Sequence, residues 1–182
     1  MRNNSAFKVA FCGLMAALGT VLLSITGLMQ IMTYAAPVYV AFLLIPVMME
    51  VGSSAAWATW FVTSVLSLLF SPDKEAAAFY IFIGYYPIIK KHFDRIGSKP
   101  IRFLVKLLFF AVSIAAMYGL LILLLGISYV KDSFGNVGIW MEILMYVILV
   151  AVMMCYDILL ERMAVLYTKK FRSKVRKLLH TQ

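Results

Sequence analysis

The stretch that decides the fold is SPDKEAAAFYIFIGYYPIIKKHFDR, residues 71–95. It begins with charged residues, continues as an apolar run and ends in a basic cluster. Ser71 is suited to cap a helix, and Asp73 and Glu75 would lie in its first turn, where the helix dipole favours acidic side chains. The pattern predicts a membrane-spanning helix over residues 72–90.

Pro87 interrupts this expected helix in its last turn. Proline has no backbone N–H, so the carbonyl of Ile83 would lose its hydrogen bond and the helix would bend at Gly84. We therefore expect a kinked crossing whose bend carries two tyrosines, Tyr85 and Tyr86.

Composition places the rest of the chain in the membrane as well. The chain has 182 residues, of which 64% are hydrophobic and 14% are charged, and its mean hydropathy is +0.94. Soluble domains are roughly 45–50% apolar and about 25% charged, and a chain of this size cannot hide such an excess in a core. The two cysteines, Cys12 and Cys155, lie in apolar runs without a CxxC pattern, so we expect neither a disulfide nor a metal site.

Apolar runs of membrane-spanning length recur along the chain. They predict an all-α, polytopic membrane protein with one transmembrane domain over residues 1–182. The first run is preceded by Arg2 and Lys8, but it is too long for a signal peptide and lacks a good cleavage site, so we expect a retained helix. The six predicted helices cover residues 9–28, 35–50, 53–70, 72–90, 105–130 and 138–161, and a basic tail covers residues 163–182.

The distribution of basic residues predicts the orientation of these helices in the membrane. Six crossings put both termini on one side of the membrane, and all but Lys74 and Lys131 of the 17 lysines and arginines then fall on that side. The positive-inside rule predicts that this side is the cytoplasm of a bacterial cell. The net charge of +9 is thereby explained without nucleic acid. The tail has apolar residues at helical spacing and is predicted to form an amphipathic helix on the lipid surface.

Small residues line one face of the first predicted helix. Such residues let a second helix backbone approach closely, which drives helix association in lipid. The face serves either packing within this chain or docking of a partner helix. It consists of Ala6, Ala10, Gly13, Ala17, Thr20, Ser24 and Gly27.

The predicted outer side collects polar and aromatic residues from three connections, Glu75 among them. Small-molecule sites are built from aromatic walls and a few oriented polar groups. Tyrosine and tryptophan also favour membrane interfaces without binding anything. The candidate ligand-binding residues are Tyr34, Asp73, Lys74, Tyr85, Tyr86, Asp132 and Trp140.

Catalytic chemistry has little support in the sequence. Asp157 and Glu161 lie one turn apart near the cytoplasmic end of the last predicted helix, where an ion-paired structural role is expected, and Glu50 is interpreted in the same way. No ionisable residue is predicted at mid-depth, which argues against a proton-coupled pump. The motifs GxxxxGK[ST], HExxH and GxSxG are absent. We predict a protein that is not an enzyme, with no catalytic residue, metal or cofactor.

The layout resembles the substrate-binding S components of energy-coupling factor transporters. The segments that carry the resemblance are AFKVA at 6–10 and GLMAA at 13–17, within GLMAALGTVLL. In that family a small-xxx-small face on the first helix docks on a transmembrane coupling subunit, and a pair of ATPases drives the assembly. The resemblance implies a protein that binds a micronutrient-sized molecule outside and topples in the membrane.

The resemblance also assigns roles to the candidate residues. Ala6, Ala10, Gly13 and Ala17 would contact the coupling subunit. Asp73, Lys74, Tyr85, Tyr86 and Asp132 would contact the ligand. The alternative is a membrane scaffold similar to the bacterial shape-determining protein MreD, whose basic connector and tail would bind acidic partners or lipid.

Overall fold

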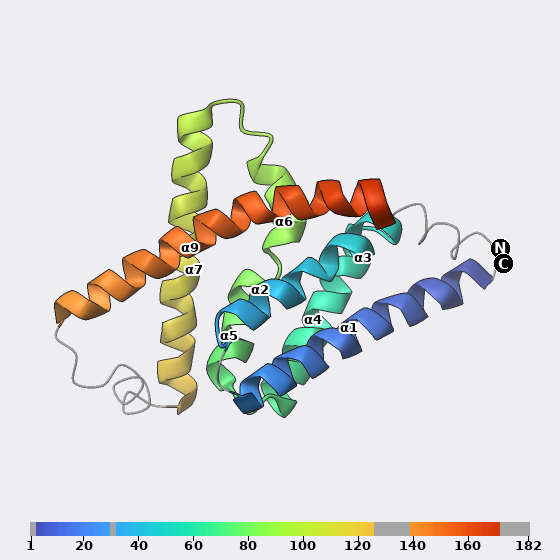
Figure 1. Ribbon diagram of the computed structural model, residues 1–182, viewed down its shortest axis with the longest axis horizontal. Helices are drawn as coiled ribbons and strands as arrows, with labels where there is room; N and C mark the ends of the chain where they lie inside the picture. Colours follow the sequence, from blue (N-terminus) through green and yellow to red (C-terminus); the bar gives the residue numbers. More distant parts are fainter. Residues whose placement is uncertain (1–2, 30–31, 126–138, 172–182) are drawn as a thin grey trace.

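The computed structural model describes residues 3–29, 32–125 and 139–171. All regular elements in these ranges are helices (Figure 1). In chain order they are α1 (Asn3–Met29), α2 (Ala35–Phe42), α3 (Leu44–Glu50), α4 (Ser53–Phe70), α5 (Lys74–Ile83), α6 (Tyr86–Phe93), α7 (Lys99–Leu125), α9 (Ile139–Leu166) and the π-helix η1 (Tyr167–Phe171).

Four of the described helices are long and apolar enough to cross a membrane: Ala6–Leu28, Ser53–Phe70, Lys99–Leu120 and Ile143–Lys170. These four spans indicate a membrane-embedded protein whose apolar faces contact lipid. The other two predicted crossings are each divided in the structure. Residues 35–50 form α2 and α3, and residues 72–90 fall in α5 and α6.

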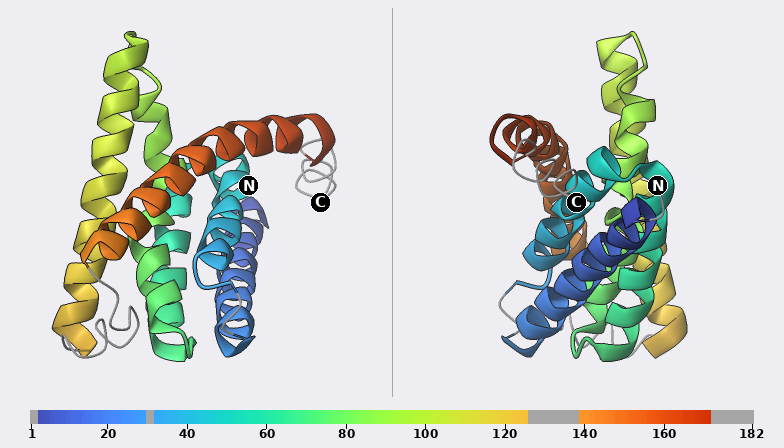
Figure 2. Two further views of the ribbon diagram at one scale, coloured as in Figure 1. Left: turned by 60° about the vertical axis from the view of Figure 1, so that its left-hand side comes forward. Right: turned by 90° about the vertical axis from the view of Figure 1, so that its right-hand side faces the viewer.

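α3 continues in the direction of α2 and α6 in that of α5, whereas α1, the α2–α3 pair, α4, the α5–α6 pair and α7 alternate in direction (Figures 1 and 2). The last turns of α1 and α4 and the first turns of α2 and α5 gather at one end of the molecule (Figure 2). The connection from α6 to α7 lies at the other end and projects beyond the neighbouring helices. α9 crosses α7 obliquely.

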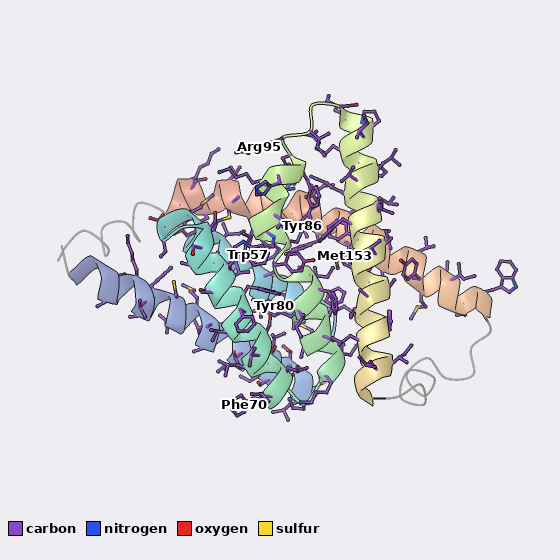
Figure 3. The ribbon with its side chains drawn as sticks, turned by 180° about the vertical axis from the view of Figure 1, so that it is seen from behind. Trp57, Phe70, Tyr80, Tyr86, Arg95 and Met153 are labelled. Atoms are coloured by element: carbon purple, nitrogen blue, oxygen red, sulfur yellow. The ribbon has the colours of Figure 1, made fainter. Side chains whose placement is uncertain are left out.

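The core lies where α2, α5, α6, α7 and α9 meet. Its buried side chains include Phe79, Tyr80, Tyr86, Met153 and Tyr156. Figure 3 shows Tyr80, Tyr86 and Met153 in the middle of the molecule, with Phe70 and Arg95 toward opposite ends. Five of the sixteen buried residues of this core are aromatic. Such large side chains bury much apolar area, so the core holds in place the two short helices that the break at Gly84 creates.

The start of α5 differs from the prediction. Asp73, and not Ser71, is the N-cap, since its Oδ1 accepts a hydrogen bond from the backbone N–H of Ala76 at 3.0 Å. The Ser71 hydroxyl instead lies 3.3 Å from the carbonyl oxygen of Leu23 on α1. Ser71 thus joins two helices, and the cap passes to the next residue with a suitable side chain.

The bend predicted from Pro87 is a complete break between two helices. α5 ends at Ile83 and α6 begins at Tyr86, with Pro87 in its first turn. A side chain at Gly84 would lie 2.5 Å from the carbonyl oxygen of Tyr80. The break therefore depends on glycine as well as on proline.

α7 begins earlier than the predicted helix 105–130. It starts at Lys99, within the stretch expected to be a basic connector. Pro100 occupies the first turn, where its missing N–H has no intrahelical partner in any case. The predicted helix at 138–161 is α9, which continues to Leu166. The end of the former, residues 126–130, and the tail from residue 172 lie outside the described residues.

α1 and α4 pack through small and hydroxyl residues. A Cβ at Gly19 would lie 2.8 Å from Val40 and 3.1 Å from Thr63, so the backbones approach closely there. Thr20 and Thr63 donate their hydroxyls to the carbonyls of Ala16 and Thr59 within their own helices. These bonds satisfy polar groups that lipid could not.

Candidate functional site

A buried cluster of charges joins α6, α7 and α9. Nζ of Lys106 lies 2.8 Å from Oδ2 of Asp157 and 2.7 Å from Oδ1 of Asp94. Lys90 pairs with Oδ1 of Asp157, and its Nζ lies 3.2 Å from Oε1 of Glu161. The side chains of Lys90, Lys106 and Asp157 are at most 10% exposed. We call these five residues the charge cluster.

Asp157 is the centre of the charge cluster. Its Oδ1 also accepts a hydrogen bond of 2.6 Å from the hydroxyl of Tyr86, and its backbone carbonyl lies 3.1 Å from Nζ of Lys90. Both carboxylate oxygens therefore have charged partners, as a buried carboxylate requires. The expected ion-paired role of Asp157 and Glu161 is confirmed, and the partners are lysines from two other helices.

Sequence reasoning missed those lysines. Lys90 and Lys106 had been placed at the two ends of the basic connector between the predicted helices 72–90 and 105–130, yet they are among the buried residues of the chain. The available signal was helical spacing, because Lys99, Arg102 and Lys106 lie on one face of a single helix. That signal becomes readable once α7 is known to begin at Lys99.

The second polar group lies at the opposite end of the bundle. The Tyr34 hydroxyl, just before α2, donates to Oε1 of Glu75 in the first turn of α5 and lies 3.3 Å from the hydroxyl of Tyr118 on α7. The ring of Phe79 meets the ring of Tyr34 edge-on at 5.5 Å between centroids. Partial burial, followed by the hydrogen bond to Glu75, raises the pKa of Tyr34 well above its usual value. A neutral phenol is therefore the form present at physiological pH.

A third group is aromatic. The ring of Tyr85 stacks on Trp57 at 5.7 Å and meets Trp60 and Phe109 edge-on at 5.3 and 6.1 Å. The indole N–H of Trp60 is buried without a hydrogen-bond partner among the described residues. The group ties α4 and α7 to the break between α5 and α6.

The seven candidate ligand residues occupy different surroundings. Tyr34 belongs to the polar group with Glu75 and Tyr85 to the aromatic group, while Tyr86 donates its hydroxyl to Asp157 of the charge cluster. Asp73 caps α5, and Nζ of Lys74 donates to the carbonyl of Leu68 at 2.8 Å.

The last two candidate residues are Trp140 and Asp132. Trp140 is 83% exposed near the start of α9, and Asp132 lies outside the described residues. The structure thus separates Tyr86 from Tyr34 and adds Tyr118 to the neighbourhood of Tyr34 and Glu75. Tyr118 could not have been chosen from the sequence, since nothing local distinguishes it from the other interfacial tyrosines.

The small-residue face of α1 divides into two parts. Ala6, Ala10, Gly13 and Ala17 are exposed, and a Cβ added at Gly13 would meet no atom within 4 Å. Thr20 and Gly27 are buried, and a Cβ at Gly27 would lie 3.1 Å from Asp73. The half of the face toward the end of α1 therefore packs against other helices of this chain. The half toward the start of α1 is not covered by the bundle.

Metal ligands do not converge in the described parts of the chain, where no group of three His, Cys, Asp or Glu residues is placed to hold an ion. Comparison with known protein families, with curated proteins and with solved structures gave no match. The arrangement of these residues is therefore what indicates the function.

Proposed function

We propose that the chain is the membrane-embedded substrate-binding subunit of an uptake system, energised by a separate coupling subunit and its ATPase pair. It would span the bacterial cytoplasmic membrane six times, with both termini in the cytoplasm. In this arrangement α2 with α3 and α5 with α6 are two divided crossings, of the kind that lines binding sites in transporters. The chain itself would carry out no catalysis.

The observation that carries the proposal is the free small-residue face of α1. Ala6, Ala10, Gly13 and Ala17 form a shallow strip that the bundle leaves uncovered. Against lipid alone, larger apolar side chains would do equally well, whereas a close helix–helix contact needs small ones. The strip therefore supports docking of a partner helix.

The solute site would lie at the opposite end from the basic residues, near Tyr34, Glu75 and Tyr118. Hydroxyl and carboxylate groups from α5, from α7 and from the turn before α2 meet there beside the ring of Phe79. An oriented polar group with an aromatic wall suits a small polar molecule that arrives from outside. The ligand is a micronutrient-sized compound in this proposal.

The test is mild purification of the tagged, full-length protein from its own host, followed by mass spectrometry of what it retains. A coupling subunit with ATPases, or a bound small molecule, would support the proposal. Cell-wall or cytoskeletal proteins without a small molecule would instead support the scaffold similar to MreD. The observation that favours that alternative is the exposed basic surface between α6 and α7, which acidic partners would fit.

A further inference from the structure

The connection between α6 and α7 forms a basic surface at one end of the molecule. α6 ends at Phe93 and α7 begins at Lys99, and both helices extend past their neighbours here (Figure 1). Arg95 lies at this end in Figure 3. Lys91, Arg95 and Lys99 are exposed, and Arg102 is half-buried. We call these four residues the basic tip.

The acidic residue that would neutralise the basic tip is turned inward. Asp94 is the sole acidic residue between positions 86 and 125. Its Oδ1 lies 2.7 Å from Nζ of Lys106, and its Oδ2 lies 3.8 Å from Nζ of Lys90. Asp94 is paired with the lysines of the charge cluster. No other acidic residue of the α6–α7 hairpin is present to offset the positive charge of the basic tip.

The start of α7 adds to this positive charge. The unpaired N–H groups of a helix start carry about half a positive charge, and the first turn of α7 contains no acidic residue. Lys99 opens the helix, and Arg102 follows one turn later on the same face. An anion bound beside Lys99 would therefore meet two cations and the positive end of a long helix dipole.

The apolar face of α7 shows where the membrane surface lies. Ile101, Leu104, Leu108 and Val112 recur at helical spacing on one face, and each is more than half exposed. This face continues without a polar residue from the spanning part of α7 to its first turn. If hydrocarbon covers it, the basic tip lies at the level of the lipid headgroups.

We propose that the basic tip binds the phosphate groups of anionic phospholipids in the leaflet on that side of the membrane. The apolar face beside it would contact the acyl chains of the same lipids. This proposal does not depend on the solute-binding function, because it concerns the opposite end of the bundle. In this proposal, the inward pairing of Asp94 leaves a lipid-facing surface that carries only positive charge.

The experiment is native mass spectrometry of the detergent-solubilised full-length protein titrated with phosphatidylglycerol or with phosphatidylcholine. The wild type should bind phosphatidylglycerol more tightly. Each basic residue near an anionic surface contributes about fivefold in affinity. The Arg95→Gln/Lys99→Gln variant should thus weaken phosphatidylglycerol binding by roughly 30-fold and leave phosphatidylcholine binding unchanged. Both changed side chains are exposed, so the fold should persist.

The matched control is Lys169→Gln/Lys170→Gln, which removes two exposed cations from η1. It should keep the affinity of the wild type for the first phosphatidylglycerol bound. Equal binding of the two lipids by the wild type, or equal loss in both variants, would overturn the proposal. So would loss of a co-purifying acidic protein in the Arg95→Gln/Lys99→Gln variant with phosphatidylglycerol binding intact, since the tip would then be a protein-docking surface.

Discussion

Oδ2 of Asp157 on α9 lies 2.8 Å from Nζ of Lys106 on α7, and both side chains are at most 10% exposed. This ion pair joins two helices that cross obliquely (Figure 1) and that are also joined by the Tyr146 hydroxyl of α9, which donates to the carbonyl of Ala111 on α7 at 2.6 Å. The buried side chains of α9 are confined to one short stretch around it, namely Met153, Tyr156, Asp157 and Leu160. Asp157 therefore lies in the most buried part of the contact between α9 and the bundle.

The first prediction concerns this attachment. Asp157→Ala leaves Lys90 and Lys106 buried with less compensating charge, and removing one partner of a buried pair typically costs about 3–5 kcal/mol. We expect a loss of this size in the free energy of unfolding, measured by equilibrium titration of the purified protein with sodium dodecyl sulfate in mixed micelles.

Glu161→Ala is the matched control for that measurement. The Glu161 side chain also contacts Lys90, but it is 60% exposed, and exposed ion pairs contribute about 0–1 kcal/mol. If both variants were equally stable, Asp157 would not hold α9 in place. The double variant Asp157→Leu/Lys106→Met should recover part of the loss, because well-packed apolar residues often replace a buried pair at little cost.

The second prediction separates the cap from the charge at Asp73. Asp73→Ala removes both and should lower the free energy of unfolding by about 1 kcal/mol. Asp73→Ser keeps an oxygen that can accept from the N–H of Ala76 and should stay close to the wild type in the same micelle titration. Equal destabilisation by the two substitutions would show that the carboxylate charge, and not the cap, is what α5 needs.

The third prediction concerns the crossings. If the bundle spans the membrane as proposed, Pro72 and Gly97 lie on opposite sides of it, and both are exposed. In a background with Cys12→Ala and Cys155→Ala, a membrane-impermeant maleimide added to intact cells should label the Pro72→Cys variant. It should label the Gly97→Cys variant only after the cells are opened. Labelling of both from outside would exclude the proposed topology.

Some helices of the fold could be predicted from the sequence and others could not. The apolar runs predicted helices at α1, α4 and α9, because membrane-spanning length is a property of local composition. The break at Gly84 was also accessible, since Pro87 removes a hydrogen bond wherever it stands in a helix. The start of α7 was missed because Lys99 and Arg102 were interpreted as part of a basic connector before the helix.

The charge cluster could not be predicted for a different reason. Lys106 and Asp157 are 51 residues apart, and no local pattern says that two helices bring them together. Tyr86 was predicted to contact a ligand at the kink, whereas its hydroxyl donates to Asp157, a partner that depends on which helix packs beside it. Local chemistry was thus readable from the sequence, whereas pairings between helices required the fold.

The fourth prediction compares two glycines of α1. Gly13 faces open space, and Gly19 lies against Val40 and Thr63. Gly13→Leu should therefore leave the free energy of unfolding and ligand binding unchanged. A partner helix, however, could no longer approach, so co-purification of a coupling subunit and solute uptake by cells should be lost.

Gly19→Leu should show the converse pattern, because a Cβ there would already lie 2.8 Å from Val40. Overpacking of this kind typically costs about 1–3 kcal/mol, so this variant should lose stability before any effect on a partner can be measured. Solute uptake that survives Gly13→Leu would remove the docking role from α1. A stable Gly19→Leu protein would mean that α1 and α4 can separate at Gly19. The packed side of α1 at Gly19 would then no longer differ from the free face at Gly13.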